Sequence, residues 1–182
     1  PSGTRLAIGH VRGWSIWDTQ NNDLVVSHPG GFCQSLRFKQ DGSGFLTGGA
    51  NGPEFWPISV IKGNLQVGEP RRLLPENSGA NERAALSPDG TRFAAVGQAG
   101  GFVGSLANGS DLQAISQGAA DTVTFSPDGR WLRLASHHDP IIHIRLAADG
   151  TMVTNLQTRS GAALFVPGGK ELLAMGQSTF SY

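Results

Sequence analysis

The chain has 182 residues, with 14 basic and 14 acidic side chains, so its formal net charge is zero. A neutral chain lacks the long-range field that draws proteins to nucleic acid or to an anionic membrane surface, and neither partner is expected. The single cysteine, Cys33, excludes an internal disulfide framework and a multi-cysteine metal site. Twenty-six glycines, ten prolines and only 15% charged residues favour an all-β fold of many short strands and tight turns.

No run of about 18 apolar residues occurs, so no membrane segment is expected in this chain. No basic stretch followed by an apolar one opens the sequence as a leader would. These absences favour the cytoplasm, although the lone thiol leaves the compartment open.

Five related stretches follow one another along the chain. They are "PSGTRLAIG" at 1–9, "RFKQDGSGFLTGG" at 37–49, "ALSPDGTRFAAVG" at 85–97, "TFSPDGRWLRLAS" at 124–136 and "LFVPGGKELLAMG" at 164–176. Their turn glycines are Gly3, Gly42, Gly90, Gly129 and Gly169, with spacings of 39, 48, 39 and 40 residues. A period near 40 is the length of one four-stranded propeller blade.

Each of these stretches is predicted to be a hairpin between two inner strands. Proline presets φ at the first turn position, aspartate bonds its own backbone, and glycine accepts the positive φ that other residues resist. The residues that supply these properties are Asp41, Gly42, Pro88, Asp89, Gly90, Pro127, Asp128, Gly129 and Gly169. Third strands ("WSIWD", "EFWPISV", "FVGSL", "IIHIRL") and more polar outer strands follow, and no segment has convincing helical spacing.

The repeat predicts one β-propeller domain of four-stranded antiparallel blades over residues 1–182. The units are approximately 1–31, 32–79, 80–118, 119–158 and 159–182, which give three full blades and two partial ones. Propellers close with about four to eight blades, so an incomplete propeller is expected, and the alternative is that the two partial units join to complete a small four-bladed ring. Open ends expose strand edges and apolar faces, and self-association or poor solubility should follow.

The 48-residue interval contains an insertion, "VIKGNLQVGEPRRLLPENSGANER", at 60–83. Repeat proteins often place binding contacts in such insertions. A solvated surface loop over residues 62–82 is the favoured interpretation, and a binding loop is the alternative.

The turns, the period and the stretch "WSIWDTQNND" at 14–23 together resemble the WD40-repeat β-propellers. That resemblance implies a structural hydrogen-bond network made by a Trp in the third strand, a hydroxyl residue in the second, an Asp in the following turn and a His before the first strand. The matching pieces are Trp17 with Asp18, Ser136, Asp139 and His28. Only one third strand carries the Trp-Asp pair, so several blades are expected to rely on packing alone.

The short "SPDG" hairpins also look like the degenerate propellers of large bacterial proteins, including those attached to serine/threonine protein kinases. No kinase motif occurs in these residues, so a catalytic domain, if there is one, lies outside this chain.

The densest polar cluster is "SHHDPIIHI", which offers His137, His138, Asp139 and His143 as ligands for a divalent metal. The favoured interpretation is that these are surface or structural residues, because neighbours on a strand point to opposite faces. A catalytic group of Ser136, His137 and Asp139 is disfavoured because no Gly-x-Ser-x-Gly elbow is present. The glycine clusters lack the context of a phosphate-binding loop and are interpreted as turns.

Four aromatic residues, Trp14, Phe55, Trp56 and Trp131, suit either a recognition surface or the core, and the core is favoured. The tripeptide Asn108-Gly109-Ser110 fits the glycosylation pattern, which arises often by chance.

The resulting hypothesis is a non-catalytic platform that binds a protein or peptide and needs no cofactor, within a larger multidomain protein. The alternative is an enzyme-type propeller, lactonase-like or peptidase-associated, with a divalent metal near the His137–His143 hairpin.

Overall fold

A computed structural model describes residues 3–75, 78, 83–98, 100–107, 111–136, 138–158, 163–167 and 171–174. Within these residues the chain forms β-strands, turns and loops and no helix. The expected all-β fold is therefore confirmed. The described part of the chain also offers no apolar helix of membrane-spanning length.

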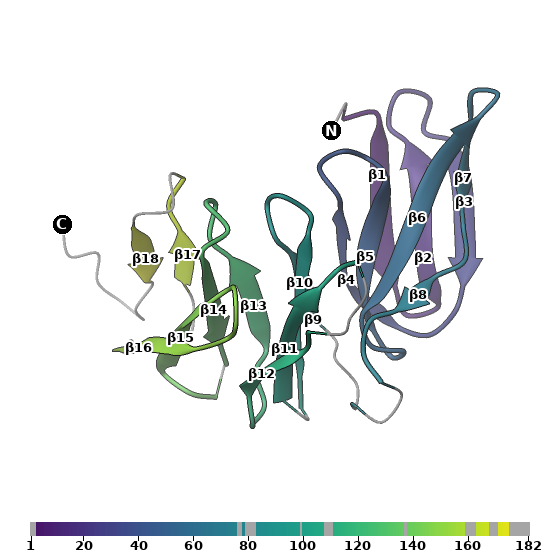
Figure 1. The fold of residues 1–182 in the computed structure, drawn as a ribbon. Helices are drawn as coiled ribbons and strands as arrows, with labels where there is room; N and C mark the ends of the chain where they lie inside the picture. The colour runs from purple at the N-terminus through teal and green to yellow at the C-terminus, as the bar shows by residue number, and fades with distance from the viewer. Residues whose placement is uncertain are drawn as a thin grey trace.

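The strands form five antiparallel sheets in chain order (Figure 1). The first sheet contains β1 (Arg5–His10), β2 (Gly13–Asp18) and β3 (Leu24–Pro29). The second contains β4 (Cys33–Phe38), β5 (Gly44–Gly49), β6 (Glu54–Ile61) and β7 (Asn64–Val67), with the short β8 (Arg71–Arg72) beside β6.

The third sheet contains β9 (Arg83–Leu86), β10 (Arg92–Gly97), β11 (Gly100–Ser105) and β12 (Gln113–Ser116). The fourth contains β13 (Thr122–Phe125), β14 (Trp131–Ala135), β15 (Ile141–Leu146) and β16 (Met152–Gln157). The fifth contains β17 (Ala163–Phe165) and β18 (Leu172–Ala174). Several four-stranded antiparallel sheets are thus present, as the sequence predicted.

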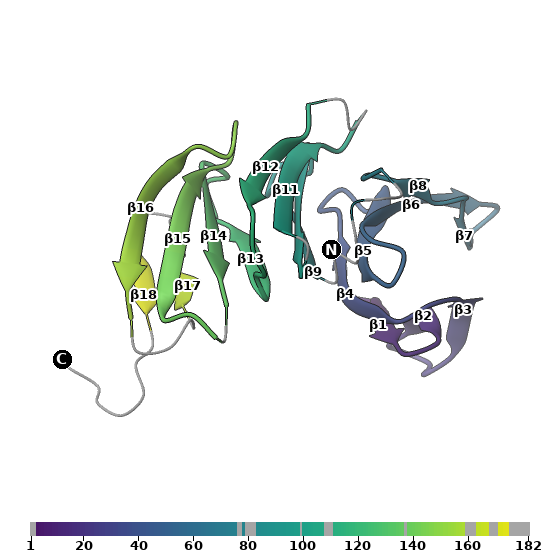
Figure 2. The same ribbon diagram turned by 90° about the horizontal axis from the view of Figure 1, so that it is seen from below.

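The sheets stand side by side, and Figure 2 shows them following one another along an arc. The first strands of successive sheets touch, because β4 contacts β9 and β9 contacts β13. These strands lie on the inner side of the arc, while β7, β12 and β16 lie farther out (Figure 2).

Each of the three interior sheets buries both of its faces, and β10 shows how. Successive side chains of a strand point to opposite faces. Phe93 and Ala95 accordingly pack toward the second sheet, in a cluster with Leu46. Ala94 and Val96 pack toward the fourth sheet. A strand buried on both faces reads as a continuous apolar run, which explains "RFAAVG".

The "SPDG" turns have the geometry that their residues favour. Gly42, Gly90 and Gly129 have φ of 73°, 67° and 73°. The amide of Gly90 donates to the carbonyl of Ser87, and that of Gly129 donates to Ser126, at 2.9 Å in both cases. Gly169 lies outside the described residues.

Candidate functional site

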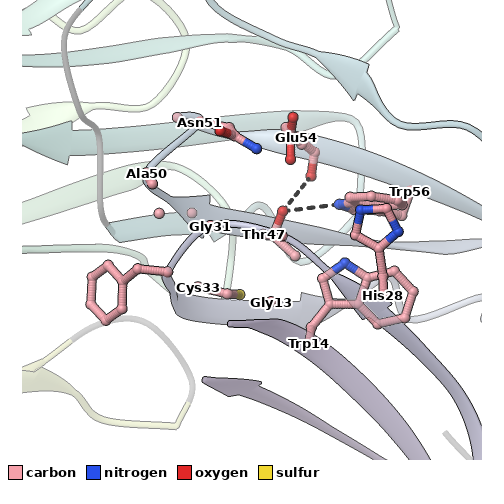
Figure 3. A pocket seen from close by; sticks show the side chains of 15 residues that line it. Gly13, Trp14, His28, Gly31, Cys33, Thr47, Ala50, Asn51, Glu54 and Trp56 are labelled. Atoms are coloured by element: carbon pink, nitrogen blue, oxygen red, sulfur yellow. Dashed lines mark hydrogen bonds between the residues drawn. The ribbon is translucent and has the colours of Figure 1, made fainter. Parts of the chain in front are cut away.

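A cluster of aromatic rings joins the first sheet to the second (Figure 3). Trp14 of β2 meets Trp56 of β6 edge to face, with ring centroids 4.9 Å apart and planes at 75°. His28 of β3 stacks on Trp14 at 5.5 Å and lies edge-on to Trp56 at 4.6 Å. Edge-to-face and offset contacts of this kind add to the stabilisation from burial alone. The core interpretation is therefore confirmed for Trp14 and Trp56.

Two hydrogen bonds connect this cluster to the backbone of the second sheet (Figure 3). The Nε1 of Trp56 donates to Oγ1 of Thr47 at 3.0 Å, and that hydroxyl donates to the carbonyl of Glu54 at 3.3 Å. The strand register makes these bonds possible, because Phe45 opposes Trp56 and Thr47 opposes Glu54. The indole of Trp56 thus reaches the hydroxyl two residues further along the neighbouring strand.

A small cavity of about 30 Å³ lies beside the rings, lined by Trp14, Thr47, Glu54, Cys33 and several glycines. The Nε1 of Trp14 is buried and has no hydrogen-bond partner among the described residues. A space of this size admits a water molecule but not an organic substrate. The cavity is therefore part of a structural junction and not a substrate site.

The carboxyl group of Glu54 borders this cavity and is 8% exposed. Burial raises its pKa, while Arg72, whose Nε lies 3.9 Å from Oε1, and Asn51 favour the charged form. Burial, followed by the negative charge of Glu54, raises the pKa of the Cys33 thiol to about 11. The raised pKa disfavours the thiolate, which is the reactive form of a cysteine.

The described residues among those that the sequence considered for a metal or catalytic site have hydrogen-bond partners outside that set. Ser136 donates from Oγ to Asp121 at 2.9 Å, and Asp139 accepts the amide of Ile141 at 2.9 Å. His137 lies outside the described residues, and His138 is exposed.

His143 has a different neighbour, since its Nδ1 lies 2.7 Å from Oδ1 of Asn155. Ser136, Asp139 and His143 line one groove of about 240 Å³ between β12 and the fourth sheet. No group of three metal-ligating side chains forms among the described residues.

The pieces that match the WD40 network come from two parts of the chain. Trp17, in the first sheet, donates to Oγ of Ser15 at 2.9 Å and is 36% exposed. Asp18 receives the amides of Gln20 and Asn21, which lower its pKa. His28 contacts the tryptophans of the aromatic cluster, while Ser136 and Asp139 lie in the loop between β14 and β15 of the fourth sheet.

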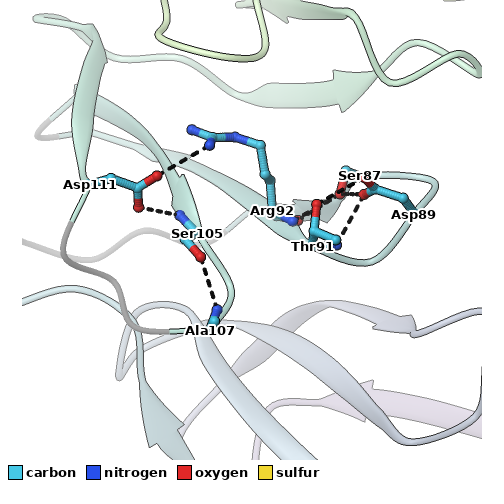
Figure 4. Close-up of polar contacts among 7 residues, drawn as sticks. All are labelled: Ser87, Asp89, Thr91, Arg92, Ser105, Ala107 and Asp111. Atoms are coloured by element: carbon cyan, nitrogen blue, oxygen red, sulfur yellow. Dashed lines mark hydrogen bonds and ion pairs between the residues drawn. The ribbon is translucent and has the colours of Figure 1, made fainter.

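The third sheet carries a polar network at its "SPDG" turn (Figure 4). Asp89 accepts the amide of Thr91 at 3.0 Å and the hydroxyl of Ser87. Ser87 in turn accepts the amide of Arg92 at 2.9 Å. The bond from Ser87 is the first cause of the lowered pKa of Asp89. Ser126 and Asp128 repeat this arrangement in the fourth sheet.

The network continues from Arg92 to Asp111, which lies between β11 and β12 (Figure 4). Its Nη1 lies 3.2 Å from Oδ2 of Asp111, and Oδ1 of Asp111 accepts the amide of Ser105 at 2.7 Å. The hydroxyl of Ser105 accepts the amide of Ala107 at 3.2 Å. These bonds hold two turns of the third sheet, while Nε and Nη2 of Arg92 are buried and have no hydrogen-bond partner among the described residues.

The insertion at 62–82 is anchored to the sheets in its described part. Arg71 donates to the carbonyl of Ala107 at 2.7 Å and to that of Leu106, and its guanidinium lies 6.0 Å from the Phe55 ring. Leu73 is buried, and its amide donates to Pro53 at 3.0 Å. The segment thus bridges the second and third sheets before it reaches β9.

A larger hollow, of about 320 Å³, lies where the ends of β4, β9 and β13 meet. Its walls combine apolar and cationic side chains: Phe38, Leu86, Pro88, Phe125, Arg37 and Lys39. Lys39 pairs with Asp41 at 2.8 Å and lies across the Gly90 turn, whereas Arg37 is exposed. Three sheets contribute to this one surface.

Comparison of the sequence with protein-family models and with curated proteins finds no match to either. The tripeptide Asn108-Gly109-Ser110 lies outside the described residues. The aromatic junction and the three-sheet hollow are the two features that sequence reasoning missed. A signal for the first was present, because Thr47 and Trp56 follow the Gly42 turn at the second- and third-strand positions.

Proposed function

We propose that residues 1–182 form a WD40-like propeller segment that acts as a non-catalytic platform and binds a protein or peptide in the hollow formed by β4, β9 and β13. In this proposal the segment belongs to a larger multidomain protein, and binding depends on shape and charge and not on an acid-base reaction.

The observation that carries the proposal is the convergence of three first strands on one hollow. Surfaces built from several rigid sheets hold their side chains in a fixed geometry, so a ligand meets a preformed site. The turns that border the hollow are held by the hydrogen bonds of Asp41, Asp89 and Asp128. A rigid rim of this kind suits recognition.

The aromatic junction gives the WD40 resemblance further support. Trp56 lies in the third strand of the second sheet, Thr47 in its second strand and His28 ahead of its first strand. Asn51 occupies the turn between the second and third strands, where the family has an Asp. The WD40 resemblance implies a Trp, a hydroxyl residue, an Asp and a His at set positions of one sheet. The residues around Trp56 fit those positions better than the Trp17-Asp18 pair does.

The chemistry of the hollow indicates the kind of ligand. Phe38, Leu86 and Phe125 offer apolar contact, and the exposed Arg37 offers a planar cation. Arginine binds carboxylates through two parallel hydrogen bonds. A peptide with an acidic residue next to an apolar one therefore fits this surface.

The test is a fluorescence-anisotropy titration of a peptide library in which one acidic and one apolar position are fixed. Arg37→Glu should weaken binding of the selected peptides by more than about tenfold, because a favourable ion pair becomes repulsive. Arg12→Glu is the matched control, since Arg12 is also exposed but lies on the first sheet's turn. Equal affinity of all three proteins for the peptides would overturn the assignment of the hollow.

A further inference from the structure

The strand β15 has its polar side chains on one face. Its sequence is "IIHIRL", and successive side chains of a strand point to opposite faces. Ile142 and Ile144 are buried in the cluster that faces the fifth sheet. Ile141, His143 and Arg145 instead line the groove of about 240 Å³ between β12 and the fourth sheet. The alternation thus places an imidazole and a guanidinium side by side on one wall of this groove.

The opposite wall belongs to the third sheet, which is the neighbour of the fourth (Figure 2), and is formed by residues 115–120. The hydroxyl of Ser116 holds the bend in this segment, because it accepts the amide of Gly118 at 3.3 Å and donates to the carbonyl of the same residue. The two sheets also pack closely beside the groove, since a Cβ placed at Gly150 would lie 2.6 Å from Cγ2 of Ile115. The groove therefore has fixed walls, as preformed ligand sites do.

Arg145 has a positive charge that no carboxylate among the described residues neutralises. Its Nη1 donates to the carbonyl of Gly150 at 2.8 Å, and it takes part in none of the ion pairs found among those residues. Burial lowers the pKa of Arg145, and its Nε has no hydrogen-bond partner in the described part of the chain. A partly buried charge without a counter-charge is destabilising. An anion in the groove would supply the missing opposite charge.

The other groups of the groove indicate which kind of anion fits. Asp139 also lines it and brings a negative charge, which disfavours a doubly charged ligand such as phosphate. Ile115, Leu134 and Ile141 provide apolar surface. A guanidinium pairs with a carboxylate through charge-assisted hydrogen bonds. A small molecule with one carboxylate and a short apolar part therefore matches the lining.

We propose that this groove binds a small organic carboxylate, with the carboxylate group on Arg145 and the apolar part on Ile115 and Leu134. The groove is lined by different residues from the hollow formed by β4, β9 and β13. The proposal thus adds a small-molecule site to the molecule and does not depend on peptide binding in that hollow.

The experiment titrates the protein with butyrate, benzoate and inorganic phosphate at constant pH and ionic strength, and follows the amide NMR shifts of residues 115–120. Arg145→Gln removes the charge. Ala119→Phe, at an exposed residue that lines the groove, keeps the charge and fills the space. Arg130→Gln is the matched control, because Arg130 is an exposed arginine of the same sheet outside the groove. Circular dichroism and urea midpoints show that each variant is folded.

Butyrate and benzoate should shift these resonances in the wild type and in Arg130→Gln with the same dissociation constants. Arg145→Gln and Ala119→Phe should each weaken both carboxylates by more than about tenfold, through loss of the ion pair and loss of space respectively. Phosphate should bind more weakly than either carboxylate. Arg37→Glu, which tests the hollow, should leave these constants unchanged, so the two proposals can fail separately.

Three results would overturn the proposal: no shift with either carboxylate, unchanged affinity in Arg145→Gln and Ala119→Phe, or tighter binding of phosphate than of the carboxylates. If Arg145→Gln failed to fold, Ala119→Phe alone would decide, because that variant leaves every charge of the groove in place.

Discussion

The junction between the first and second sheets and the junction between the third and fourth sheets solve the same packing problem with different side chains. The first uses Trp14, Trp56 and Phe45, with hydrogen bonds and a small cavity. The other uses alanine, valine, leucine and isoleucine, with Phe125 packed against them. Large rings need partners for their N–H groups, whereas small aliphatic residues need only close contact. Sheet stacking therefore does not depend on one particular network.

The largest expected effect is at the aromatic junction. Trp56→Ala removes a side chain that is 4% exposed and should lower the free energy of unfolding by about 3–5 kcal/mol. Urea unfolding followed by circular dichroism measures this loss. Trp17→Ala is the control, because Trp17 is partly exposed on the face of the first sheet that points away from this junction. Its loss of unfolding free energy should be clearly smaller. If both substitutions lowered the free energy of unfolding by similar amounts, the aromatic junction would contribute no more to stability than a partly exposed tryptophan does.

The aliphatic junction should be nearly as sensitive. Leu132→Ala creates a cavity at a residue with no exposed surface and should cost about 2–5 kcal/mol in the same experiment. Leu173→Ala, at a residue that is 55% exposed, should cost much less. If Leu132→Ala were tolerated, the third and fourth sheets would not be joined by tight packing.

The turn aspartates should contribute less than the core residues. Asp89→Ala removes the acceptor for Thr91 and Ser87 and should cost about 0.5–1.5 kcal/mol at neutral pH. Because hydrogen bonds lower the pKa of Asp89, its contribution is present above the unfolded value near 3.8 and is lost as pH falls further. Urea midpoints at pH 7 and pH 3 should therefore differ less for the variant than for the wild type.

Glu54 should show the opposite pH dependence and the smallest effect. Burial raises its pKa above 4.5, so the folded state binds the proton more tightly, and this contribution to stability declines as pH rises through that raised pKa. Glu54→Gln should consequently be neutral or stabilising at pH 7, by less than about 1 kcal/mol, since the long contact to Arg72 is lost together with a buried charge, and the glutamine keeps a side-chain oxygen for Asn51. A marked loss of stability at pH 7 would show that the ion pair outweighs the cost of burying the charge.

The hairpin turns were the most predictable part of the molecule, because each is fixed by residues adjacent in sequence. The Asp89 and Asp128 turns require only a local acceptor and a glycine with positive φ, and the sequence states both. The sequence did not predict the short β8 strand, because Arg71 and Arg72 show no alternation of apolar and polar residues. Their position depends on Phe55, Glu54 and the carbonyls of the third sheet.

The candidate sites were less predictable than the turns. The histidine-rich stretch looked dense in sequence, yet His143 pairs with Asn155 and Asp139 accepts a backbone amide, although both residues line the same groove. The hollow beside Arg37 and Phe125 was not foreseen, since its walls come from three sheets whose first strands are about 40 residues apart.

By itself the sequence determined the all-β class, the four-stranded antiparallel sheets and the turns between inner strands, because these follow from alternation and from the conformational limits of Pro, Asp and Gly. Only the tertiary structure decided which tryptophans are buried and which polar groups meet. Those outcomes depend on contacts between sheets, and no local pattern specifies which residue of one sheet will lie against which residue of the next.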